Sequence, residues 1–207
     1  MHRRTLLISA VFGLLAACGR RKKLKALPAG SVVLAFGDSV THGTGAAPGE
    51  DWPSRLAALT GWNIVNAGVP GDTAEAGKAR LGPLLEEHRP ALVIVEIGGN
   101  DFLRRRAASA VLEDIRQIVR TAKASGAQVV LVAVPELSLL AALAQKPGDS
   151  PIYRQLGEEE GVPVIESVFS DILSHAEWRA DQIHPNAEGY RRMAAGIEAA
   201  LKEIGLR

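Results

Sequence analysis

The feature that most constrains the fold is a regular alternation, from residue 31 onward, of short aliphatic runs with longer amphipathic segments. Continuous runs of Val, Ile and Leu are typical of strands covered on both faces, and the segments between them have the periodicity and end signals of helices. Strands are expected at residues 31–36, 62–65, 91–97, 128–134 and 162–165, and helices at 51–60, 73–88, 107–124, 150–160 and 187–205.

This order of elements predicts a single α/β domain. Strands joined by helices through short links form parallel pairs with right-handed crossovers. We therefore expect a three-layer α/β/α sandwich around a five-stranded parallel sheet of flavodoxin-like strand order. In such sheets ligands bind beyond the carboxyl ends of the strands, so the chemistry is expected at that edge.

The first 17 residues predict a signal peptide. A basic start at Arg3 and Arg4 precedes a 12-residue apolar run at residues 6–17. A helix of that length spans roughly 18 Å, too short for the roughly 30 Å hydrocarbon core of a membrane. Residues 15–18, Leu-Ala-Ala-Cys, resemble the bacterial lipobox, which implies that Cys18 becomes the lipidated first residue of an exported protein on the cell envelope, facing the periplasm. The alternative is a free cysteine beside an ordinary cleavage site.

Residues 18–30 are predicted to form a basic tether ahead of a catalytic or binding domain at residues 31–207. Five Lys and Arg side chains fall within residues 20–25, whereas the chain beyond them holds 17 basic and 23 acidic residues. Such a tether either lies against anionic lipid headgroups or is a solvated linker. The overall net charge of +1 gives no indication of nucleic-acid binding.

Three polar groups follow the ends of predicted strands. Ser39 comes directly after the first strand, where a nucleophile would stand at the carboxyl edge of the sheet. Asn100 follows the third strand, and its side-chain amide can donate a hydrogen bond to a developing oxyanion. Gly71, after the second strand, offers a backbone N–H with no side chain in the way. Each residue also fits an ordinary role in a turn or a helix cap, so none is decisive alone.

Asp181 and His184 lie in the loop after the fifth strand, just before the last helix. A spacing of three residues in a turn lets the carboxylate reach the His184 ring and leaves Nε2 free to take a proton from Ser39. His42, three residues after Ser39, is the rival base. Its position on the same local segment as the serine favours a role at the surface instead.

Together these motifs resemble the signature blocks of the SGNH (GDSL-type) hydrolases, in the branch of thioesterase I, lysophospholipase and arylesterase. The resemblance implies a serine ester hydrolase with Ser39 as nucleophile, His184 as base and Asp181 as its orienting acid. It also implies an oxyanion hole formed by the amides of Ser39 and Gly71 with Asn100, and no need for a metal or an organic cofactor. The blocks that carry it are Gly37-Asp38-Ser39, Gly71, Gly99-Asn100-Asp101 and Asp181-x-x-His184.

Two further segments near the predicted edge invite interpretation. Residues 135–150 form a long apolar connection, in which Leu137, Leu139 and Leu140 either border an acyl pocket as part of a lid or belong to a short helix packed on the core. Residues 104–106, three consecutive arginines, either meet an anionic group near the site or form a solvated loop. Residues 72–75 approximate a capping box with Asp72 at the cap.

Several functions remain open at this level. The first is an esterase acting on small-molecule substrates such as lysophospholipids, thioesters or short-chain esters, and the second is an O-acetyl esterase acting on envelope carbohydrate. A third, of another class, is a non-catalytic ligand-binding lipoprotein, since a fold does not fix a function. The complete set of Ser39, Asn100, Asp181 and His184 favours catalysis, because a binding site needs no oriented base. Membrane contact is expected through lipidated Cys18, and the sequence carries no signal for an oligomeric state.

Overall fold

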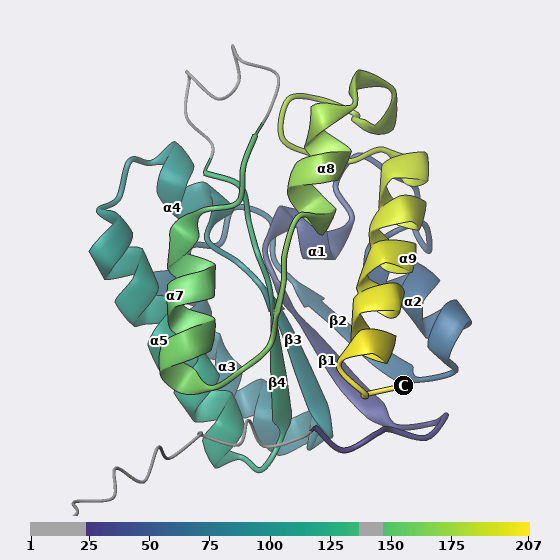
Figure 1. Ribbon diagram of the computed structural model, residues 1–207, viewed down its shortest axis with the longest axis vertical. Coiled ribbons are helices and arrows are strands. Elements are labelled where there is room, and N and C mark those ends of the chain that lie inside the picture. The colour runs from purple at the N-terminus through teal and green to yellow at the C-terminus, as the bar shows by residue number, and fades with distance from the viewer. Residues whose placement is uncertain (1–23, 137–146) are drawn as a thin grey trace, which may run out of the picture.

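The computed structural model describes residues 24–136 and 147–207. Five parallel strands form one sheet in the order β2-β1-β3-β4-β5, which is the predicted flavodoxin-like order (Figure 1). The strands are β1 (Val32–Gly37), β2 (Asn63–Gly68), β3 (Leu92–Glu96), β4 (Gln128–Val132) and β5 (Val164–Ile165).

Helices cover both faces of the sheet, so the predicted three-layer sandwich is confirmed. On one face α2 packs against α9, which also contacts α8, and on the other α5 packs against α3 and α7 (Figure 1). The helices are α1 (Ser39–His42), α2 (Trp52–Thr60), α3 (Ala74–His88), α4 (Gly99–Leu103), α5 (Ala108–Ala124), α7 (Pro151–Glu160), α8 (Val168–Ser174) and α9 (Ala187–Glu203), with a 3-10 turn at Ala176–Trp178.

The core follows from the aliphatic runs. All five residues of β3, and β1 after its first residue, are buried, because helices lie on both faces of these central strands. The amphipathic helix α5 buries an apolar stripe that includes Val111, Ile115 and Ile118. This packing holds the carboxyl ends of β1 and β3 side by side, with Gly37 paired with Glu96.

The predicted boundaries need correction at the last strand. The expected strand at 162–165 is reduced to Val164 and Ile165, because the Val162 N–H closes the end of α7 on the Gly157 carbonyl and Pro163 has no N–H to donate. The segments after β1, β3 and β5, which were expected to be loops, contain the short helices α1, α4 and α8. All three lie beyond the carboxyl ends of the strands (Figure 1).

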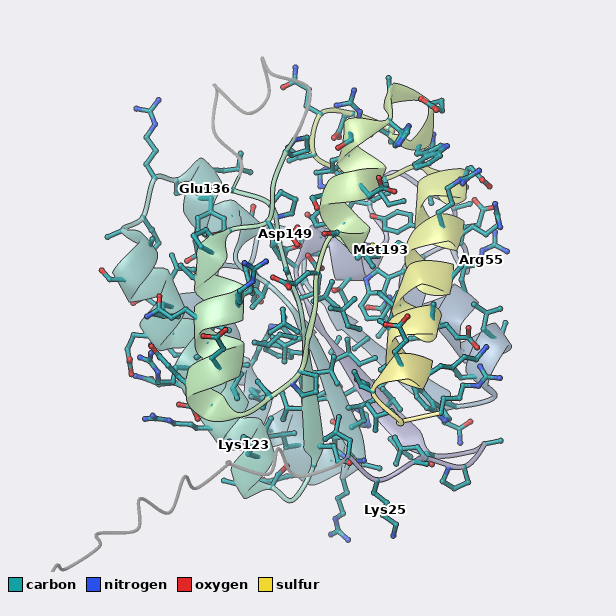
Figure 2. All side chains as sticks on the ribbon, in the orientation of Figure 1. Lys25, Arg55, Lys123, Glu136, Asp149 and Met193 are labelled. Carbon is teal, nitrogen blue, oxygen red and sulfur yellow. The ribbon has the colours of Figure 1, made fainter. Side chains whose placement is uncertain are left out.

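The chain enters the domain at the opposite end. The side-chain amide of Gln128, at the start of β4, accepts from the Lys25 N–H and donates to the Lys25 carbonyl, and the Leu27 N–H donates to the Leu206 carbonyl. Figure 2 shows Lys25 at the end of the molecule far from Glu136, which follows β4. Among the described residues, no helix is both long and apolar enough to cross a membrane. Residues 1–23, with Cys18 and the predicted signal peptide, lie outside the described chain.

Candidate active site

Ser39 occupies the first turn of α1, directly beyond β1. Asp38 caps this helix through a 3.1 Å bond from the Val40 N–H to its Oδ1. The ends of β1 and β3 lie close together here, because a Cβ on Gly37 would be 2.2 Å from the Glu96 carbonyl oxygen. Only glycine fits between the two strand ends, and the turn that follows presents Ser39 at the edge of the sheet.

His184 and Ser39 are far apart in the sequence but are in contact in the fold. The His184 Nε2 lies 2.9 Å from the Ser39 Oγ, and Nδ1 lies 2.8 Å from the Asp181 Oδ2. The other oxygen of Asp181 accepts the backbone N–H groups of Ile183 and His184, both at 2.8 Å, and these bonds fold the turn that aims the ring. Partial burial alone would raise the pKa of Asp181, but these hydrogen bonds hold the pKa below its usual range.

Asn100 lies at the start of α4 and lines the same pocket as Ser39 and His184. Its Nδ2 donates to the Asp72 carbonyl at 2.9 Å and lies 3.3 Å from the Asp38 Oδ2. The first bond orients the amide, and the second is long enough to be exchanged for a better acceptor. The side chain is therefore held in place on the lining of this pocket, with one N–H only weakly engaged.

Gly71 sits in the turn between β2 and α3. The Asp72 N–H closes the turn on the Val69 carbonyl at 3.1 Å, with Pro70 second and Gly71 third at φ +83°. Glycine suits that third position because a type II turn requires a positive φ there. Thr73 caps α3, so the prediction of Asp72 as the cap is wrong, because its carboxylate is bound by Arg80 instead.

A pair of buried carboxyl groups lies under the serine. Burial raises the pKa of Asp38 to about 6. Burial, followed by the charge of Asp38, raises the pKa of Glu96 well above its ordinary value. Thr41 donates to one Glu96 oxygen at 2.7 Å, while the other has no hydrogen-bond partner among the described residues. Burial therefore favours the protonated form of Glu96.

Replacing Glu96 with glutamine is expected to raise stability more at pH 8 than at pH 4. The folded protein binds the Glu96 proton more tightly than the unfolded chain, whose carboxyl has a pKa near 4.5. Stability of the natural protein is thus lost as pH rises from 4.5 toward the folded pKa, and Glu96→Gln escapes that loss. Thermal unfolding at both pH values measures the difference in stability between Glu96→Gln and the natural protein, with Glu87→Gln at an exposed position as control. The same difference at pH 4 and pH 8 would contradict the expectation.

A pocket that is open to solvent adjoins Ser39 and His184. Its apolar part comes from residues on five separate segments, namely Val40, Leu103, Val134, Phe169 and Ile183. Sequence patterns missed Phe169, because α8 was not expected, and Val134, because it follows a strand without a polar signal. Leu137, Leu139 and Leu140, the predicted acyl-pocket residues, lie outside the described residues.

Two other predictions from the sequence concern His42 and the arginines at residues 104–106. His42 is exposed, and the ring that reaches Ser39 is that of His184. Arg106 forms ion pairs with buried Asp101 and with Asp114, so it is not merely solvated, whereas Arg104 reaches the Gly71 carbonyl at 3.1 Å. Within residues 24–136 and 147–207, no cluster of three or more His, Cys, Asp or Glu side chains is placed to hold a metal ion.

Comparisons with known proteins show which family the chain is similar to. Residues 35–192 match the GDSL-like Lipase/Acylhydrolase family. "Thioesterase 1/protease 1/lysophospholipase L1" of Escherichia coli (strain K12) is 33% identical over 183 residues, which cover 85% of this chain and 86% of that protein. "Arylesterase" of Vibrio mimicus is 30% identical over 82% of this chain and 87% of its own length. The crystal structure of TesA superposes with a TM-score of 0.73 at 28% identity, over 84% of this chain and 99% of that one.

The matched region begins within β1 and ends within α9, so it contains Ser39, Asn100 and His184. The predicted resemblance to SGNH ester hydrolases is thereby confirmed for the family and for the class of reaction. The chain belongs to the GDSL-like lipase/acylhydrolase family.

Proposed function

We propose that this ester hydrolase works through an acyl-enzyme on Ser39. The observation that carries the proposal is the unbroken line from Asp181 through His184 to Ser39, with contacts of 2.8 and 2.9 Å. The neutral ring has its Nδ1–H on Asp181, so its Nε2 lone pair faces the serine hydroxyl.

Each step has a residue in place. The Ser39 Oγ attacks the ester carbonyl while His184 takes its proton, and the amides of Ser39 and Gly71 with the Asn100 side chain stabilise the oxyanion. His184 then protonates the leaving alcohol or thiol as the acyl bond to it breaks. Water, deprotonated by the same ring, attacks the acyl-enzyme and releases the acid and free Ser39.

Covalent labelling tests the nucleophile. A serine-directed phosphonate added to the full chain is expected to modify Ser39, found by peptide mass, in parallel with loss of hydrolysis of a short p-nitrophenyl ester. A folded protein that neither hydrolyses the ester nor reacts at Ser39 would instead favour the ligand-binding lipoprotein.

The substrate we propose is an ester or thioester with a short acyl chain. The pocket beside Ser39 is small, and its apolar lining includes the almost fully buried side chains of Phe169 and Val134. The names of the Escherichia coli and Vibrio mimicus relatives, a thioesterase and lysophospholipase and an arylesterase, agree with acyl substrates of this kind.

Replacing Phe169 with leucine is expected to shift the preference toward longer acyl chains. The smaller side chain deepens the pocket, so a longer chain buries additional methylene groups, each worth about 0.8 kcal/mol. The measurement is kcat/KM across p-nitrophenyl esters from acetate to decanoate. Ile172→Val, on the same helix but outside the pocket lining, is the control and should keep the natural profile. An unchanged profile in Phe169→Leu would remove this side chain from the acyl site.

Carbohydrate O-acetyl esters are the weaker second candidate. Sugar rings bind on exposed aromatic faces. Trp52 and Trp62 are buried, and the ring of Trp178 is contacted by His175, stacked at 3.9 Å, and by the Arg192 guanidinium at 4.1 Å. These contacts leave the tryptophans poorly suited as platforms for a glycan.

We also propose that the protein is exported and held on the bacterial cell envelope by lipidated Cys18. Cys18 and Lys25 are seven positions apart in the sequence, so the chain between them reaches at most about 25 Å. Since Lys25 lies at the end opposite the catalytic edge (Figure 2), the pocket of the anchored protein would face the aqueous space rather than the membrane. Metabolic labelling with a radioactive fatty acid tests the anchor: label should be lost in Cys18→Ser, and retention there would contradict it.

A further inference from the structure

Arg80 of α3 lies behind the catalytic edge, and all three nitrogens of its guanidinium are bound. Its Nε donates to the Asp72 carboxylate at 2.5 Å, and its two terminal nitrogens donate to the carbonyls of Ala67 at 2.8 Å and Gly37 at 2.7 Å. The group also lies 4.2 Å from the centre of the Phe36 ring. The side chain is 23% exposed, so these bonds are largely sheltered from water.

The acceptors lie on the two segments that carry Ser39 and Gly71 of the proposed oxyanion hole. Gly37 ends β1 two residues before Ser39, and Ala67 is the second-last residue of β2, ahead of Gly71. Asp72 follows Gly71 directly, and its carbonyl anchors the Asn100 amide. A single side chain therefore ties together the backbone leading to Ser39, the backbone leading to Gly71, and the residue that binds the Asn100 amide.

We propose that Arg80 is the positioning residue of the oxyanion hole. The inference rests on the proposed function, since it assigns a role in holding the donors rather than in touching substrate. An oxyanion hole lowers the barrier only when its donors stand where the charge develops, and an error of about 1 Å can cost on the order of 100-fold in rate.

The arrangement requires arginine rather than a general cation. Three acceptors on two segments need donors in a rigid planar fork, which lysine does not have. The pairing with Asp72 keeps the fork in one orientation while the two carbonyls are bound. Lysine in its place keeps the charge and the contact with Phe36 but binds fewer of the three acceptors.

Kinetics of Arg80→Met test the inference. We expect kcat for a p-nitrophenyl ester to fall about 10- to 100-fold while KM changes less than about threefold, because ground-state contacts are retained. The affinity for a trifluoromethyl ketone, which forms an oxyanion on Ser39, should fall by the same factor as kcat/KM. A residue that serves only folding would move neither quantity in the folded fraction. Arg80→Lys should lie between the two proteins.

The control is Lys78→Met, which removes a cation from the same helix, where Lys78 pairs with Asp114. It should keep the natural kcat and inhibitor affinity. Should Arg80→Met not fold, Asp72→Asn replaces it, because this change weakens the Arg80 contact but keeps the carbonyl that binds Asn100; about a tenfold loss of kcat is then expected.

The inference is overturned if folded Arg80→Met, or Asp72→Asn in its stead, keeps kcat and inhibitor affinity within threefold of the natural protein. Asn100→Ala, measured alongside, separates this failure from failure of the proposed function. If Asn100→Ala loses activity and the Arg80 variant does not, only the role of Arg80 is wrong. If Asn100→Ala is also fully active, the oxyanion hole itself is wrongly placed.

Discussion

Ser39→Ala is expected to lower kcat for a p-nitrophenyl ester by at least about 10⁴-fold while the fold is unchanged. The hydroxyl is the only group of Ser39 that the substitution removes, and among the described residues its one side-chain hydrogen bond is the 2.9 Å bond to His184. Without that oxygen no acyl-enzyme forms, so the remaining activity must come from binding and the oxyanion donors alone. Steady-state kinetics with thermal unfolding measures both parts.

His184→Ala should cost about as much, and the double variant little more, because serine and base act as one unit. Ser31→Ala is the matched control, since its hydroxyl bonds to the Pro28 carbonyl far from the site. Ser39→Ala protein that turns over within tenfold of the natural rate would show that another residue is the nucleophile.

The sequence predicts the sheet well because the central strands are aliphatic throughout. β1 and β3 are covered on both faces, so their residues could not alternate with polar ones, and the runs are visible. The sequence pattern places the start of the short strand β5 too early. Val162 and Pro163 are residues typical of strands, but the Val162 N–H bonds back to Gly157 of α7 and Pro163 has no N–H to donate.

The residues of the site also fall into those that the sequence reveals and those that it does not. Ser39, Asn100 and His184 carry polar chemistry at strand ends and are therefore visible as candidates. Glu96 gives one signal, a charge at the end of an aliphatic run, but its burial depends on helices that cover it. Arg80 gives none, because an arginine within an amphipathic helix is ordinary, and only the fold brings three acceptors to its guanidinium.

Asn100→Ala is expected to lower kcat by about 10²- to 10³-fold, equivalent to roughly 3–4 kcal/mol of transition-state stabilisation. One N–H of the side chain is fixed on the Asp72 carbonyl at 2.9 Å, and the other makes only a 3.3 Å contact with Asp38. That second N–H is free to strengthen when a negative charge appears at the carbonyl oxygen. Because the charge is absent in the bound substrate, KM should change little.

Asn63→Ala is the matched control. The Asn63 amide bonds to the Gly30 carbonyl at the far end of β2, so this substitution should leave kcat unaltered.

Inhibitor binding by Asn100→Ala also separates charge stabilisation from packing. If Asn100 acted only by holding the Asp72 turn, Asn100→Ala would weaken binding of a trifluoromethyl ketone no more than binding of the product acid. We expect instead that Asn100→Ala weakens the ketone about as much as it lowers kcat/KM and leaves product affinity nearly unchanged, because only the tetrahedral oxyanion requires the lost donor. Equal losses for ketone and product would exclude Asn100 from the oxyanion hole.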